Sequence, residues 1–228
     1  TEVDVVSKDF KYPQSFRVNL AVEKMLPFDI RGTLEGIYTK KMNDIYYQNI
    51  NIEESGKMLN NFKDKRPLYG PSISADYTSV ILLSNTNEGY SYNVTGKLEK
   101  SFDFGLDLMA AYTYGVSKGV NDGTSSQAYS NWSYNENWRG SNNPEVSYTD
   151  FDQPHRIIAS ASYKVAYGKN LATSIALFYS GNSGSRYSLC YNGDLNKDGV
   201  KGNDLIYVPT NSEIDAMIIK PLTNLPAD

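Results

Sequence analysis

The chain contains 228 residues, with 26 acidic and 22 basic side chains, and its formal net charge at pH 7 is −4. A chain of this length can form one large all-β domain or two smaller domains. The net acidity and the lack of a basic stripe exclude nucleic-acid binding, because contacts to phosphate require clustered Lys and Arg.

Tyrosine is unusually frequent, with 19 residues in the chain. Its apolar ring and polar hydroxyl group favour membrane interfaces and polar binding surfaces. The mean hydropathy of −0.49 is low for a membrane protein, but in a transmembrane β-barrel only every second strand residue faces lipid. No run of about 18 consecutive apolar residues occurs, which excludes a transmembrane helix. The polar start at Thr1 carries no secretory signal, so we expect an exported protein to begin upstream of it.

The first two predicted strands cover residues 15–26 and 30–47. In the first, Phe, Val and Leu alternate with Arg, Asn, Ala and Glu, and a short break at residues 26–29 separates the two strands. Because successive side chains of a strand point to opposite faces, this alternation gives one apolar and one polar face. Residues 48–88 are rich in Asn, Ser, Gly and Lys and are predicted to form a long loop.

The next two predicted strands, residues 89–100 and 102–117, alternate most regularly. Tyr92, Val94 and Leu98 share one face of the first of them. The second is about 15 residues long, well above the length of about 5–6 residues that is usual for strands of soluble proteins. This length suits a barrel strand, which needs about 9–11 residues to cross a membrane.

Residues 118–153 are predicted to form a second long loop, and residues 155–166 and 170–181 the last two strands. A tight turn at residues 167–170 joins these strands, whose apolar faces carry Ile, Ala, Leu and Tyr. Residues 182–228 are again polar and rich in glycine, and they are predicted to form a third loop.

The connections alternate between turns of two to five residues and loops of about 35 to 40 residues. Outer-membrane barrels have this asymmetry, with short periplasmic turns and long extracellular loops. The sequence therefore predicts an all-β fold over residues 1–228, an antiparallel meander of about six long strands that is part of a large transmembrane β-barrel. We expect the turns near Pro27, Ser101 and Lys169 to lie at one end of the meander.

Three segments carry a resemblance to a known family: residues 34–49, residues 151–156 and residues 193–209. They resemble the barrel of Oar-like TonB-dependent outer-membrane receptors of Bacteroidetes type. The resemblance implies a non-enzymatic receptor or transporter in the cell outer membrane, with membrane lipid, the energy-coupling TonB complex and an extracellular glycan or peptide as partners. Such receptors hold a plug domain inside a barrel of about 22 strands. This chain lacks the plug and the energy-coupling box, so we expect an internal fragment of the barrel.

A cluster of aromatic side chains in the second loop is the candidate ligand surface: Trp132, Tyr134, Trp138 and Tyr148. Asparagines are interleaved with them. Aromatic faces stack on sugar rings or clasp peptides, and amides hydrogen-bond to hydroxyl groups or to backbone. The alternative is that these aromatic side chains pack the loop against its neighbours.

The third loop contains a candidate calcium site. Asp194, Asn196 and Asp198 occupy positions 1, 3 and 5 of a calcium-loop pattern, and Gly199 occupies position 6. Position 12 lacks the usual Glu, and Asp204 at position 11 is the possible substitute. The alternative is a solvated turn rich in Asp and Asn.

Catalytic chemistry has little support in the sequence. His155 and Cys190 are the single histidine and the single cysteine, so a multi-histidine metal site or an internal disulfide cannot be built. Asp150 and Asp152 lie close in sequence, but a loop gives no basis for pairing them as the acid and base of a hydrolase. The alternative to a barrel is a soluble secreted β-sandwich that binds glycan or peptide through its tyrosine-rich loops.

Overall fold

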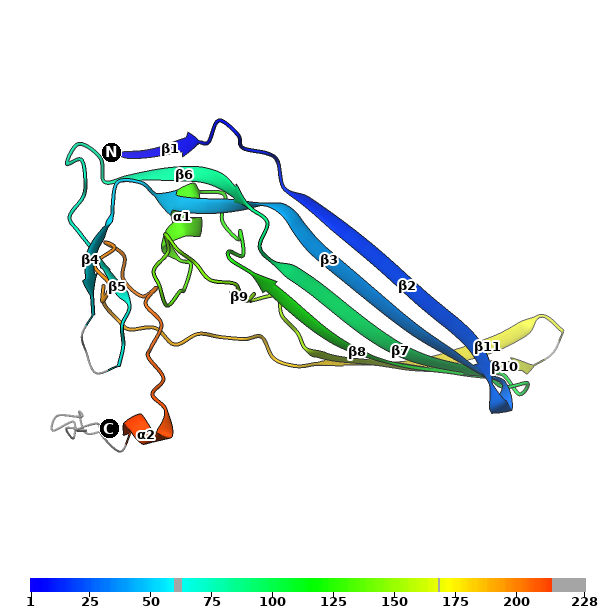
Figure 1. The fold of residues 1–228 in the computed structure, drawn as a ribbon. Coiled ribbons are helices and arrows are strands. Elements are labelled where there is room, and N and C mark those ends of the chain that lie inside the picture. Colours follow the sequence, from blue (N-terminus) through cyan, green and yellow to red (C-terminus); the bar gives the residue numbers. More distant parts are fainter. Residues whose placement is uncertain (60–62, 168, 215–228) are drawn as a thin grey trace.

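The computed structural model describes residues 1–59, 63–167 and 169–214, and one long β-sheet dominates it (Figure 1). Within these residues, nine strands belong to this sheet and two more form a small separate sheet. A cap of loops and short elements lies at one end of the large sheet, and hairpin turns lie at the other (Figure 1). A β-sandwich needs two sheets packed face to face, and the described strands do not have that arrangement.

Six long strands form most of the large sheet in the described residues. They are β2 (Gln14–Leu26), β3 (Ile30–Asn49), β7 (Tyr90–Ser101), β8 (Leu106–Gly119), β10 (His155–Tyr167) and β11 (Leu171–Asn182). Each of them pairs antiparallel with the next in that order. The predicted antiparallel meander of long strands is therefore confirmed.

The largest difference in strand boundaries is at the start of β8, which begins at Leu106 and not at residue 102. Residues 102–105 form the turn before it. Phe102 N donates to Leu106 O at 2.8 Å, and Gly105 N donates to Phe102 O at 3.0 Å. The apolar alternation continues through this turn because its aromatic side chains share the apolar surface of the strand, so the sequence pattern does not mark the boundary.

The turns of the three hairpins formed by the long strands lie together at the end opposite the cap (Figure 1). The first is η1 (Pro27–Asp29), and the second is formed by residues 102–105. The third lies between the paired residues Tyr167 and Leu171, and position 168 lies outside the described residues. This arrangement confirms the prediction that the three turns lie at one end.

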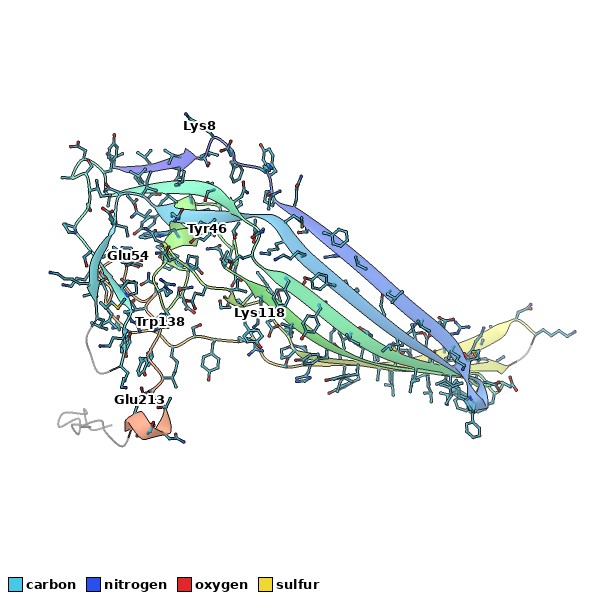
Figure 2. All side chains as sticks on the ribbon, viewed as in Figure 1. Lys8, Tyr46, Glu54, Lys118, Trp138 and Glu213 are labelled. Atoms are coloured by element: carbon cyan, nitrogen blue, oxygen red, sulfur yellow. The ribbon has the colours of Figure 1, made fainter. Side chains whose placement is uncertain are left out.

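The strand register places the predicted apolar positions side by side on one face of the sheet. Val18 lies opposite Tyr38, and Tyr38 lies opposite Tyr92. Farther across the sheet, Tyr112 lies opposite Ile157. Side chains project from both faces of the long strands (Figure 2), and most of these apolar ones are exposed. An exposed apolar face of this size is what the lipid-facing surface of a barrel requires.

Polar side chains cover the opposite face and hydrogen-bond across the strands. Asn19 Nδ2 donates to Glu35 Oε1 at 2.9 Å, and the hydroxyl groups of Thr95 and Thr113 lie 2.9 Å apart. In a closed barrel this face lines the interior, which is polar in transmembrane barrels.

Aromatic rings form two bands on the apolar face. Near the turns, the ring of Phe104 lies 5.1 Å from Phe102 and 6.4 Å from Tyr163, and near the cap Tyr92 lies 6.4 Å from Tyr114. β8 begins at Leu106, and the eight residue steps from there to Tyr114 span about 27 Å of strand, or about 20 Å along the normal of a membrane at a tilt of about 40°. Phe104 lies in the turn just beyond this stretch, so the two aromatic bands flank a strand segment close in length to the apolar band of about 25 Å of a transmembrane barrel.

The segments predicted as loops, and the residues before the first predicted strand, contain regular structure that the sequence did not indicate. The additional elements are β1 (Glu2–Val6), β4 (Glu54–Met58), β5 (Pro67–Tyr69), β6 (Ser79–Thr86), α1 (Ala128–Ser133), β9 (Ser147–Tyr148) and α2 (Asn211–Ile214). In the sheet order, β6 lies between β1 and β3, pairing antiparallel with β3 and parallel with β1. The prediction of an unstructured loop over residues 48–88 therefore needs correction, because β6 is part of the main sheet.

The hydrophobic core of the described residues lies in the cap. Its buried members are Tyr47, Ile52, Tyr69, Ile81, Ala128, Trp132 and Val200. They come from β3, β5, β6, α1 and the connecting loops, so this cluster joins segments that are far apart in sequence. The cap is consequently an ordered structure and not a set of independent loops.

The outermost long strands leave the described sheet open. β2 pairs with β3 alone and β11 pairs with β10 alone among the described strands, and both are largely exposed. Free strand edges attract further strands.

No helix in the part of the chain that the structure describes is long and apolar enough to cross a membrane.

Ala110 and Ala111 test the assignment of the two faces. Ala110 lies on the apolar face of β8 between the aromatic bands, and Ala111 lies on the polar face. We expect Ala110→Lys to cost up to about 2–4 kcal/mol if the site is near the bilayer midplane, and Ala111→Lys, the matched control, to be tolerated. Urea titrations of both variants in lipid bilayers measure this difference. Equal stabilities would contradict the face assignment.

Gly105 tests the turn before β8. Its φ is 91°, and an added Cβ would lie 2.4 Å from the backbone oxygen of Lys164 in β10. We expect Gly105→Ala to destabilise the folded protein by at least about 1 kcal/mol, because both the backbone conformation and the contact are unfavourable. Gly96→Ala is the control, since a Cβ at that position meets nothing within 4 Å. A Gly105→Ala variant as stable as the control would show that the turn adapts.

Candidate functional site

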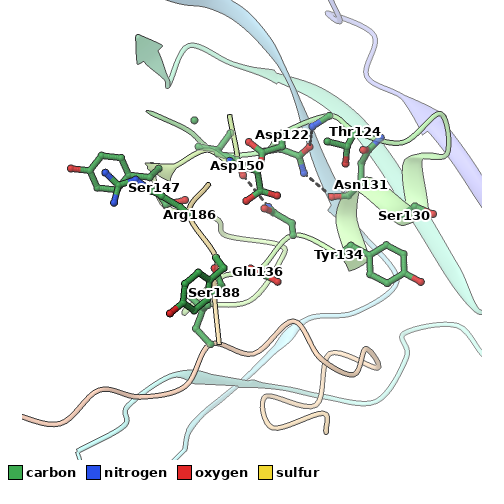
Figure 3. Close-up of a pocket in the computed structure, with 18 residues that line it drawn as sticks. Asp122, Thr124, Ser130, Asn131, Tyr134, Glu136, Ser147, Asp150, Arg186 and Ser188 are labelled. Atoms are coloured by element: carbon green, nitrogen blue, oxygen red, sulfur yellow. Dashed lines mark hydrogen bonds between the residues drawn. The ribbon is translucent and has the colours of Figure 1, made fainter. Parts of the chain in front are cut away.

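A pocket of about 320 Å³ lies at the cap end of β8 (Figure 3). The segment that follows β8, residues 119–124, forms one wall, and residues 130–136 of α1 and the turn after it form another. The remaining walls come from residues 147–150, residues 186–188 and Leu205. Five segments of the chain therefore meet around one cavity.

Asparagine side chains shape the wall of this pocket. Asn131 Nδ2 donates to Ser125 O at 2.8 Å and to the hydroxyl group of Tyr47 at 3.2 Å, and its Oδ1 accepts from Ser125 N. Asn121 Nδ2 donates to Asn131 O at 2.6 Å. The amide of Asn131, one of the asparagines that the sequence suggested as ligand contacts, thus serves mainly to fix the loop, and so does the amide of Asn121.

Three carboxylates line the pocket: Asp122, Glu136 and Asp150. Asp122 Oδ2 accepts from the backbone N of Asp150 at 3.1 Å. Burial raises the pKa of Asp122, and the charge of Asp150 raises it further. The salt bridges among the described residues include none of these three side chains, so no direct ion pair with a described residue neutralises them.

Arg186 is the basic side chain of the pocket wall, and it is already paired. Its Nε donates to Asp152 Oδ2, and the buried Asp152 also accepts from Ser117 N at 2.6 Å. The guanidinium group lies 3.7 Å from the centroid of the Tyr148 ring, and Lys118 Nζ lies 4.5 Å from it. These contacts fasten the segment after β11 to the end of β8.

The structure separates the four predicted ligand-binding aromatic residues. Tyr134, 78% exposed, and Tyr148 line the pocket. Trp138 is 36% exposed and lies in the cap outside this pocket (Figure 2). Trp132 is only 1% exposed, and its Nε1 donates to Asn142 Oδ1 at 2.8 Å. Trp132 thus has the packing role that was the alternative expectation.

The sequence did not single out Asp122, Glu136 or Tyr187 as site residues, although all three line the pocket. Asp122 stands in an Asn-Asp-Gly turn, which is a common turn sequence and carries no signal for ligand binding. Tyr187 lies in a segment without regular structure. Their proximity depends on long-range packing of the cap.

A second group of polar residues fixes the cap from within. Arg66 is 0% exposed; its Nη2 lies 2.8 Å from Asp64 Oδ2, and its Nη1 lies 3.1 Å from Asp204 Oδ1. Its Nη2 also donates to Leu205 O at 2.6 Å. This guanidinium group joins the β4–β5 region to the C-terminal loop.

Three of the predicted calcium-binding residues, Asp194, Asn196 and Asp198, lie in one turn, and the fourth, Asp204, packs against the backbone of that turn. Asp194 Oδ2 accepts from Gly199 N at 3.1 Å, and Asn196 Oδ1 accepts from Asp198 N at 2.9 Å. Asp204, by contrast, points its oxygens at Arg66 and at the backbone N–H groups of Leu195 and Asn196. The described residues contain no group of three or more His, Cys, Asp or Glu side chains suited to a metal ion. Calcium binding by Asp194, Asn196 and Asp198 stays a prediction.

Comparison with known proteins gives the family. Residues 1–204 match the family described as "Outer membrane beta barrel domain". The chain belongs to this family. The search of curated proteins gave no match, and the search of solved structures gave none either.

Membership of the outer-membrane β-barrel family places the protein in the cell outer membrane. Barrels of this kind have short periplasmic turns and longer extracellular loops, so the cap and its pocket lie on the extracellular side. The family is generally non-enzymatic.

His155 and Cys190, the single histidine and the single cysteine, have structural roles in this barrel. His155 Nδ1 lies 2.7 Å from the hydroxyl group of Tyr112, and the two rings stack at the entry to β10. Burial raises the pKa of the Cys190 thiol to about 11, with further contributions from Glu136 and Asp204, so the thiol stays protonated at neutral pH. Both side chains contribute to packing of the barrel end and the cap.

Arg66 offers a test of the internal ion pairs. Arg66→Met leaves Asp64 and Asp204 buried without their counter-charge, and we expect a loss of about 3–5 kcal/mol in cap stability. Limited proteolysis of the protein in membranes should show faster cleavage of the cap than of the strands.

Arg139→Met is the control for this experiment. Arg139 lies 3.8 Å from Glu145, and both side chains are exposed, so the loss of this pair should leave the cleavage rate almost unchanged. Equal cleavage of the two variants would show that the Arg66 pairs do not hold the cap together.

Proposed function

We propose that this outer-membrane barrel protein is a receptor and transporter that binds an extracellular ligand in the cap pocket for TonB-dependent uptake. The observation that carries the proposal is the pocket itself, which lies at the cap end of β8 and is bordered by five segments of the cap. A barrel that served only as a membrane pore would not need a cap fixed by buried ion pairs. The dependence on TonB rests on the resemblance of residues 34–49, 151–156 and 193–209 to Oar-like receptors.

Tyr134 provides the mutational test of ligand binding. Its ring is exposed and borders the pocket, so Tyr134→Ala should remove a contact to ligand without disturbing the strands. Aromatic residues at binding hot spots cost at least about 2 kcal/mol when truncated, which predicts roughly a thirtyfold loss of affinity. Tyr12→Ala is the control, because Tyr12 is equally exposed and lies outside the pocket.

The experiment uses intact protein in outer-membrane vesicles and two fluorescent probe pools, one of short peptides and one of oligosaccharides. We expect at least one pool to bind, with Tyr134→Ala weaker than Tyr12→Ala. Removal of the TonB complex from whole cells should abolish accumulation of the bound probe and leave surface binding unchanged. Binding unaffected by Tyr134→Ala would contradict the pocket, and accumulation without TonB would contradict the energy coupling.

A further inference from the structure

We propose that the cap pocket recognises an organic cation, a ligand that carries an ammonium or guanidinium group. This inference rests on the proposed function, which it deepens by naming the ligand class. It depends on three features of the described pocket: unpaired carboxylates, aromatic rings beside them, and a volume that fits one head group.

The charge of the pocket is the first argument. Asp122, Glu136 and Asp150 line it, and none of them forms a salt bridge with a described residue. Asp122 and Asp150 are neighbours, since the carboxylate of one accepts from the backbone of the other at 3.1 Å. Like charges held close together raise each other's energy, and a bound cation removes that cost.

The basic residues near the pocket do not neutralise it. Arg186 donates to Asp152, and Lys41, whose charge also reaches Asp122, is paired with Asp44. Lys118 Nζ lies over the ring of Tyr148, so one ammonium group without a salt bridge to a described residue stands beside three carboxylates. In Figure 3, Arg186 and Tyr134 lie on opposite sides of the carboxylates of Asp122 and Asp150. The space between them therefore presents acceptors and negative charge to a ligand.

The aromatic rings give the second argument. Tyr134 and Tyr187 line the pocket and are 78% and 83% exposed. A cation over an aromatic face is attracted to the ring, and the attraction is greatest for partly desolvated cations. The same wall already shows this geometry, because Arg186 and Lys118 both lie over the ring of Tyr148. A ligand cation can make the equivalent contact with the two exposed rings.

The volume is the third argument. A cavity of about 320 Å³ lies at the lower end of the range of small-ligand sites, about 300–1,000 Å³. It holds one basic side chain or a short polyamine segment. A neutral sugar would leave the three carboxylates uncompensated, and an anion would be repelled by them.

The test measures binding of four probes to the intact protein in outer-membrane vesicles: an arginine-containing tripeptide, the same tripeptide with Glu in place of Arg, spermidine, and a neutral trisaccharide. The variants are Asp122→Asn and Glu136→Gln. Asp76→Asn is the control, because Asp76 is an exposed cap carboxylate outside the pocket. Protease resistance of the cap in each variant confirms that it is folded.

We expect the arginine tripeptide to bind at least tenfold more tightly than the Glu tripeptide and the trisaccharide. Each pocket variant should lower that affinity at least tenfold, and the control should not. If spermidine binds as tightly as the tripeptide, the ligand is a free polyamine; if it binds much more weakly, the ligand is a basic peptide.

Two results would overturn the inference. Tighter binding of the trisaccharide or the Glu tripeptide, lost in Tyr134→Ala, would keep the receptor function and reject the cation. Cation binding that is equal in the pocket variants and the control would place the cation elsewhere. If none of the four probes binds but one of the two probe pools does, the organic cation is rejected and the receptor function is kept; if neither the probes nor the pools bind, ligand capture by the cap pocket is rejected as well.

Discussion

Backbone hydrogen bonding is the constraint on which the rest of this structure depends. Hydrocarbon offers no water to a free N–H or C=O group, so strands that cross a membrane must be paired along their length. β3 shows the consequence most clearly, because it pairs with β2 and β7 near the turns and with β6 near the cap. At Asn49 a side chain continues the pairing: Asn142 accepts from Asn49 N and donates to Asn49 O. The cap is therefore attached to the sheet by the same kind of bond that holds the strands together.

The cap obtains its order from polar contacts more than from apolar burial. Its core is small, whereas buried amides and carboxylates such as Asn131, Asp152 and Asp204 each hold several backbone or side-chain partners. Buried polar groups stabilise a structure only when their hydrogen bonds are satisfied, and satisfied networks fix one arrangement. A cap of this kind holds its pocket walls in place while its outer surface remains compatible with water.

The long strands could be predicted from sequence because alternation of apolar and polar residues with a period of two is a local pattern. Lipid contacts only one face of each strand, so the alternation is strict. β6 was not predicted because its apolar residues form one short run of four in its eight residues, and such a run shows no alternation of apolar and polar side chains. The pocket was not predicted for another reason: it exists only in the folded cap, and the cap depends on contacts between residues far apart in sequence. Arg66 and Asp204 are 138 positions apart, and Asn49 and Asn142 are 93 apart. The sequence around Trp132 does not show that its indole N–H donates a hydrogen bond to Asn142. The inward orientation of the Trp132 ring therefore could not be predicted from local sequence, because it depends on contacts made elsewhere in the fold.

If the cap pocket binds a ligand as proposed, the position of Arg186 links that binding to the integrity of the barrel wall. The chain leaves β11 at Asn182, Ser183 N donates to His155 O at 2.8 Å, and Arg186 then joins the pocket wall. β11 has only β10 as a partner in the described sheet, so fraying of this outer strand withdraws one side of the pocket. By thermodynamic reciprocity, a molecule held in the pocket stabilises β11 against that fraying. Under the proposed function, occupancy of the pocket and pairing of β11 with β10 are therefore coupled parts of a single equilibrium.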